Sequence, residues 1–185
     1  MWWSKPRNPA GGRRPTRRAV LAAAGLAALA GCGFTPVYGP GGAAQGLRGQ
    51  IAVDPPSDAE GYALVRHLEE RLGRAEAPVY RLAADIALRQ EELGVTQDQE
   101  ITRYQILGAV EFRLIEMATG RLVSSGEVET FTGYSAPVFS SARSTIAGNT
   151  VSVLAAERDA RERLMVILAD RIVARLLATA GEWRR

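Results

Sequence analysis

Two long stretches of alternating hydrophobic and polar residues dominate the central part of the chain. The first covers about 79–89 and the second about 102–116, and such alternation predicts strands with one buried face. The apolar face of the first stretch consists of Tyr80, Leu82, Ala84, Ile86 and Leu88. The apolar face of the second consists of Tyr104, Ile106, Val110, Phe112 and Leu114. We therefore expect two neighbouring half-buried strands.

A third strand is expected over about 121–133, after a tight turn at Ala118-Thr119-Gly120. Its pattern is weaker, with Leu122 and Val128 facing inward and Glu127 and Glu129 facing outward. A short strand over 51–54 precedes these three and ends at two prolines. Long strands with short links favour an antiparallel meander.

Two segments have the spacing of amphipathic helices. The first follows Ser57 and Glu60, which match a capping box, and it carries apolar residues at helical spacing up to a closing Gly73: Tyr62, Val65, Leu68 and Leu72. The second covers about 151–179, with Ile167 and Val173 beside a row of Leu164, Leu168, Ile172 and Leu176. Glu157/Arg161 and Arg158/Glu162 are expected to pair four residues apart along this helix.

The order β-α-β-β-β-α predicts an α+β fold. A mainly antiparallel sheet of about four strands has one apolar face, and two helices can cover it in a two-layer sandwich. We assign this single domain to residues 50–180, with a tail at 181–185. Residues 32–49 are rich in glycine and are expected to form a flexible tether.

The N-terminus has the parts of an export signal. Residues 1–18 are basic, residues 19–31 are apolar, and Cys32 follows, so a signal peptide over 1–31 is predicted. Leu29-Ala30-Gly31-Cys32 resembles the bacterial lipobox, which implies cleavage between Gly31 and Cys32 and covalent diacylglyceryl and N-acyl lipid on Cys32. The alternative is a signal peptide whose apolar region happens to end in cysteine. Thr16-Arg17-Arg18 leaves the twin-arginine and Sec export routes both open.

The excess of basic residues lies in the N-terminal export segment, so the mature part of the chain is not basic. Six of its 23 lysines and arginines lie within residues 1–31, which contain no acid. The remaining 17 face 20 carboxylates, so the mature part carries about −3. A pI near 9.4 thus reflects the export signal, and no nucleic-acid partner is expected. No apolar run reaches the roughly 18 residues needed to span a bilayer.

Catalytic chemistry is not expected. His67 is the only histidine, and we interpret it as an exposed helical residue. The single cysteine excludes an intramolecular disulfide and is assigned to lipid. Glu127 and Glu129 share a strand face that we expect to be solvated, whereas acid–base work needs a cleft. No metal site, no cofactor and no enzyme activity are predicted.

The residues around the lipobox carry a more specific resemblance. Cys32-Gly33-Phe34-Thr35-Pro36-Val37-Tyr38-Gly39 resembles the start of the LPS-assembly lipoprotein LptE family, in particular its alphaproteobacterial members. The β-α-β-β-β-α order and a polar Tyr134-Ser135-Ala136 loop before the last helix are similar as well. The resemblance implies an outer-membrane lipoprotein on the periplasmic face that plugs the LptD β-barrel and helps to insert lipopolysaccharide into the outer leaflet. Gly33, which is not acidic, agrees with sorting to the outer membrane.

Arginine would have to make any contact with lipopolysaccharide phosphates, because the mature part contains no lysine. Arg103 and Arg143 are the candidates, since both lie outside the predicted core. They could equally be solvated or pair with acids of a barrel wall. Two other functions remain open: an auxiliary lipoprotein of a lipid-transporting ABC system, and a small lipid-anchored hydrolase. The hydrolase lacks a nucleophile and base in the sequence.

Overall fold

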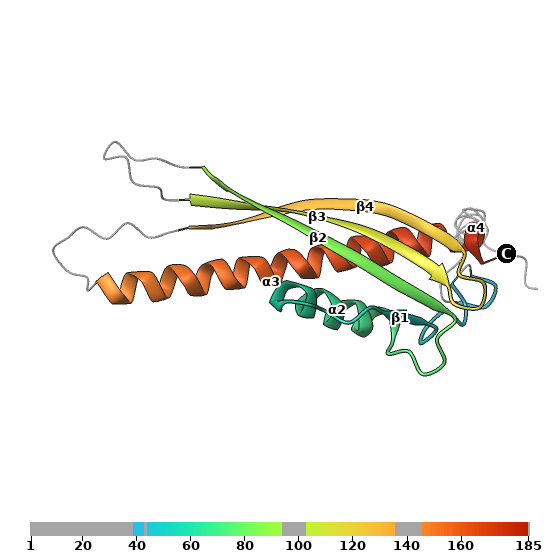
Figure 1. The fold of residues 1–185 in the computed structure, drawn as a ribbon. Coiled ribbons are helices and arrows are strands. Elements are labelled where there is room, and N and C mark those ends of the chain that lie inside the picture. The colour runs from blue at the N-terminus through green and yellow to red at the C-terminus, as the bar shows by residue number, and fades with distance from the viewer. Residues whose placement is uncertain (1–38, 43, 94–102, 136–145, 185) are drawn as a thin grey trace, which may run out of the picture. The chain divides into compact units, whose positions relative to one another are not determined.

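The computed structural model describes residues 39–42, 44–93, 103–135 and 146–184, with the side chains of the last stretch described from residue 151. It confirms the α+β architecture (Figure 1). The elements are β1 (Ile51–Val53), α2 (Ala59–Leu72), β2 (Tyr80–Glu92), β3 (Arg103–Glu116), β4 (Leu122–Ser135), α3 (Ile146–Ala178) and α4 (Ala180–Trp183). The predicted signal peptide, Gly31, Cys32 and Arg143 lie outside the described residues.

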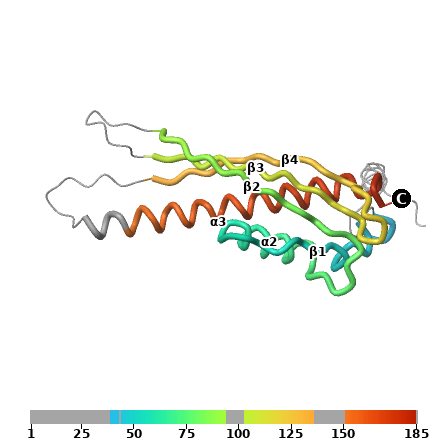
Figure 2. Tube along the Cα trace, viewed as in Figure 1, coloured from blue at the N-terminus to red at the C-terminus, as the bar shows by residue number. Residues whose placement is uncertain are grey.

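The four strands form one sheet in the order β1-β2-β3-β4. β1 pairs parallel to β2, from Ile51 opposite Tyr80 to Val53 opposite Leu82, because α2 is the crossover between them. The other pairs are antiparallel and long. The α3 and α2 helices pack together on one side of the sheet, as the trace shows (Figure 2). The predicted meander is therefore correct.

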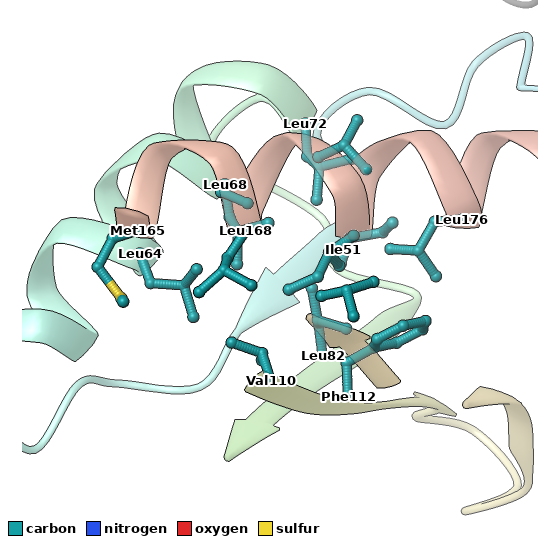
Figure 3. Packing of buried hydrophobic residues seen from close by; sticks show 14 of the residues in the cluster. Ile51, Leu64, Leu68, Leu72, Leu82, Val110, Phe112, Met165, Leu168 and Leu176 are labelled. Carbon is teal, nitrogen blue, oxygen red and sulfur yellow. The ribbon is translucent and has the colours of Figure 1, made fainter. Parts of the chain in front are cut away.

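The core lies between the sheet and the two helices (Figure 3). The predicted inward faces of β2 and β3 are confirmed, with Leu82, Val110 and Phe112 fully buried. Leu88 is the exception, because 37% of it remains exposed. From α3, a wide apolar stripe completes the core: Ala160, Leu164, Met165, Leu168, Ala169, Ile172, Val173 and Leu176. At the crossing of α3 over β3, a Cβ on Gly108 would lie 2.9 Å from Leu164, so glycine permits this close approach.

The inward face of β4 was predicted incorrectly at its first residue. Leu122 is 54% exposed, whereas Val128 is buried as expected. The register explains the difference, since Ser124 pairs with Leu114 but Leu122 pairs with Ile115. Val123, which lies between Ser124 and Leu122, has no partner on β3 and forms a β-bulge. One such inserted residue moves the side chains before it in β4 to the opposite face of the sheet.

The α2 helix is also rotated relative to the prediction. Its buried residues are Gly61, Leu64, Leu68 and Leu72, whereas Tyr62 is 64% exposed. The N-cap is Asp58, whose carboxylate accepts a 2.7 Å hydrogen bond from the amide of Gly61, so the predicted Ser57/Glu60 capping box is wrong. A carboxylate is a charge-assisted cap at the positive end of the helix dipole. Gly73 closes the helix at φ 80°, as expected.

The two chain segments flanking the domain contribute to its core. Ala44 and Leu47 are 0% and 1% exposed, so the predicted tether does not extend to residue 49. Likewise, the predicted tail at 181–185 contains the end of α4, whose Trp183 is 7% exposed and meets Tyr80 edge to face at 5.1 Å. Among the described residues, the helices lack the combination of length and hydrophobicity that a membrane span requires.

Candidate functional site

Arg103 lies at the end of the sheet where β2 and β4 finish and β3 begins. It is the first residue of β3, is exposed, and stands opposite Ser135, the last residue of β4. Its carbonyl accepts a 2.9 Å hydrogen bond from the amide of Leu93, just beyond β2. The side chain is therefore presented at the end of the sheet that lies far from β1, as the sequence predicted for a residue outside the core.

A stacked pair of tyrosines follows Arg103 at this end of the sheet. Tyr104 and Tyr134 are cross-strand partners whose rings stack at 5.1 Å and 14°. Gln90 donates a 3.1 Å hydrogen bond to the Tyr134 hydroxyl, and burial raises the pKa of Tyr134, so the phenol stays uncharged. Sequence reasoning placed Tyr134 and Ser135 in a loop, whereas both belong to β4. Tyr134 is only 7% exposed, so the stacked rings belong to the core side of the sheet, whereas Arg103, one residue before Tyr104, points to the opposite face.

A groove of about 410 Å³ lies between α2 and the first half of α3. Tyr62 and Leu154, which are 64% and 55% exposed, belong to its wall. Its charged rim is largely paired. Arg66 and Glu162 are 2.6 Å apart, and this hydrogen bond raises the pKa of Arg66. The groove therefore offers apolar surface and has little net charge from these pairs to attract an anion.

The expected charge pairs of α3 are only partly formed within the helix. Arg161 contacts Glu157 at 2.6 Å, as predicted, and also Glu60 of α2 at 3.0 Å. The hydrogen bond to Glu60 raises the pKa of Arg161. Glu162 pairs across the groove with Arg66 instead of with Arg158. These contacts fix α2 against α3.

A second hollow, of about 490 Å³, has most of its wall on the sheet face opposite the helices. Ala87 and Ala109 are cross-strand partners that provide a shallow floor of small side chains. Leu107 and Phe131 are also paired across strands beside them, and Phe131 is 64% exposed. This face presents apolar atoms to a partner or ligand.

His67 was predicted to be exposed, and that prediction is wrong. Its side chain is 20% exposed and lies between two carboxylates. Nδ1 is 3.3 Å from Glu70, and Nε2 is 3.3 Å from Asp170 on α3, which also contacts Arg71 at 3.1 Å. The ring is held between α2 and α3 in a contact network, so its evident role is to join the helices. Glu127 and Glu129 are exposed, as predicted.

Comparisons with known proteins give a family match and a shared fold. A family model described as LptE, lipopolysaccharide-assembly, matches residues 49–176. A putative lipoprotein from Caulobacter crescentus has the same fold, with a TM-score of 0.59 at 19% identity, covering 78% of this chain and 99% of that one. The rare lipoprotein B from Shewanella oneidensis aligns with a TM-score of 0.49 at 14% identity, over 74% and 98% of the two chains. The comparison with curated proteins gives no match.

Proposed function

Because this chain belongs to the LptE family of lipopolysaccharide-assembly lipoproteins, we propose that it is the lipid-anchored partner of an LptD-type outer-membrane β-barrel. In this role the two proteins pass lipopolysaccharide to the outer leaflet, with this chain as a plug within the barrel. The observation that carries the proposal is the family match over residues 49–176, which runs from before β1 almost to the end of α3.

The proposed role is structural and requires no covalent chemistry. A plug needs a rigid body with polar surface inside a water-filled barrel. The outer face of the sheet and the paired rim of the α2–α3 groove supply mixed polar and apolar surface of this kind. We further propose that the chain acts without cofactor or enzyme activity, at the periplasmic face of the outer membrane, held there by lipid on Cys32.

Co-purification tests the barrel partnership. The tagged chain, expressed in its native host and extracted from solubilised outer membrane, is expected to retain a large β-barrel protein in a stoichiometric complex. Recovery of an inner-membrane ABC transporter instead would favour the auxiliary-lipoprotein alternative. Recovery of the chain alone, from membranes in which the barrel is abundant, would contradict the proposal.

The exposed end of the sheet is the proposed contact for lipopolysaccharide. Changing Arg103→Glu together with Arg143→Glu is expected to weaken lipopolysaccharide binding in vitro, because anionic phosphates are then repelled. Thermal stability should stay near wild type, since Arg103 is exposed. Wild-type binding should also fall with added salt, as contacts between exposed charges do.

A matched charge reversal serves as the control. Arg74→Glu with Arg121→Glu changes the net charge equally at exposed positions away from that sheet end, and should leave binding unchanged. Equal affinity in the Arg103/Arg143 variant and wild type would remove these two residues as lipopolysaccharide contacts. Equal losses in both double variants would indicate a general charge effect.

A further inference from the structure

The β4 strand is an edge of the sheet, and arginines of α3 reach its backbone. Arg171 donates a hydrogen bond from Nη1 to the carbonyl of Glu129. Arg175 donates to the carbonyl of Glu127 at 3.5 Å, and Arg163 to that of Gly133 at 3.5 Å. All three acceptors are odd-numbered residues. Carbonyls two residues apart on a strand point the same way, so these three line the edge that faces away from β3.

The arginines along α3 and the carbonyls along the edge of β4 have matching spacings. The arginines lie four or eight residues apart, at Arg163, Arg171 and Arg175, and four residues of helix span about 6 Å. The edge carbonyls of a strand recur about every 6.7 Å, which is close to that step. Because α3 runs antiparallel to β4 here, ascending helix positions meet descending strand positions. In the same register, the apolar Ile167 lies midway between Arg163 and Arg171, level with Phe131, which lies midway between Gly133 and Glu129.

The β4 strand has a glycine where Arg175 lies against it. A Cβ on Gly126 would lie 3.0 Å from Nε and 3.1 Å from Cζ of Arg175, so the guanidinium lies directly over the glycine. The guanidinium of Arg163 is also 3.0 Å from Asp159, which is one turn earlier in α3. The arginines are thus seated against the strand and are not simply extended into solvent.

The strand otherwise has the properties of an edge that pairs with another strand. Its sequence contains Val128, Thr130, Phe131 and Thr132, all of which favour β structure. It contains no lysine, arginine or proline, the residues that commonly protect an edge. Glu127 and Glu129 point to the outer face of the sheet and not along the edge. Phe131 is 64% exposed and would be covered by a partner strand.

We propose that Arg163, Arg171 and Arg175 form an edge cap that prevents a second copy of this chain from pairing along β4. An identical strand is the natural competitor, because an antiparallel β4–β4 pair about a twofold axis satisfies both edges with the same residues. Each arginine donates a hydrogen bond to a carbonyl that an incoming strand would need as an acceptor. Its side chain also takes up the space in which the backbone of that strand would lie. The cap goes beyond the proposed role in lipopolysaccharide assembly and does not depend on it.

The association state of the full chain tests the cap. The chain is expressed in a Gram-negative host, purified in detergent, and its protein mass is measured by light scattering after size exclusion. Wild type is expected to be monomeric. The triple variant Arg163→Ala, Arg171→Ala, Arg175→Ala is expected to shift to a species of about twice the protein mass at the same concentration. Circular dichroism checks that the triple variant remains folded.

Two further variants make the test specific. Arg74→Ala, Arg81→Ala and Arg158→Ala remove the same charge at exposed positions outside the cap and should leave a monomer. Adding Glu129→Pro to the triple variant removes an amide that points to the edge, while the hydrogen bonds to β3 remain, and should restore the monomer. A dimeric wild type, a folded triple variant that stays monomeric, or association that persists with Glu129→Pro would overturn the proposal.

Discussion

Replacing Phe112 by alanine is expected to lower the free energy of unfolding by roughly 3–5 kcal/mol. Phe112 is fully buried in β3, beneath α3. Its cross-strand partners are Ala84 on β2 and Gly126 on β4, which are too small to fill the space that the ring would leave. A cavity costs most free energy of unfolding where its walls cannot collapse. We therefore expect a destabilisation in the upper part of the roughly 3–5 kcal/mol range.

Urea unfolding followed by circular dichroism measures this effect. Phe131→Ala is the matched control, since Phe131 is on the neighbouring strand but 64% exposed. It should change the free energy of unfolding by less than about 0.5 kcal/mol. A loss below about 1 kcal/mol for Phe112→Ala, with an unchanged m-value, would contradict the packing described for the core.

Replacing Cys32 by serine is expected to abolish lipid attachment completely. The lipobox resemblance assigns the thiol of Cys32 as the acceptor of the diacylglyceryl group, and a serine hydroxyl is a much weaker nucleophile at neutral pH. Without the acyl chains the protein loses its anchor, because each buried CH₂ contributes about 0.8 kcal/mol to membrane binding. Cys32 lies outside the described residues, so this remains a prediction from the sequence.

Metabolic labelling with a radioactive fatty acid, combined with membrane fractionation, measures the loss. The Cys32→Ser chain should be unlabelled and should run as an uncleaved precursor. Gly33→Ala is the control, since it changes the next residue while the thiol is retained, and its labelling should match wild type. Normal labelling of Cys32→Ser would exclude Cys32 as the lipidated residue.

The architecture and the two longest strand faces could be predicted from the sequence because they depend on local periodicity. Alternation in β2 and β3 identifies which residues face inward, and the structure confirms this from Tyr80 to Ile86 and from Ile106 to Leu114. Most of the stripe on α3 was equally readable, with Leu164, Leu168 and Ile172 buried as expected, but Ile167, predicted beside them, is 39% exposed. In each of these elements, many consecutive residues contribute to one consistent signal.

Short or irregular elements were predicted less well, since one residue can change their phase. On β4, the extra residue Val123 between Ser124 and Leu122, the partners of Leu114 and Ile115, turns Leu122 outward. In α2, Leu64 and not Tyr62 faces the core, and a carboxylate at Asp58 replaces the expected serine cap. Each alternative satisfies the local pattern almost equally well, so contacts with other elements make the choice.

The sequence by itself determined the element order, the core stripe of α3 and the lipobox that predicts an anchor. Only the tertiary structure brought His67 to Asp170, packed Trp183 against Tyr80, and set the arginines of α3 against the edge of β4. These contacts join residues far apart in the chain. Their formation depends on the rotation and separation of packed elements, which hydrophobic periodicity within a single element does not specify.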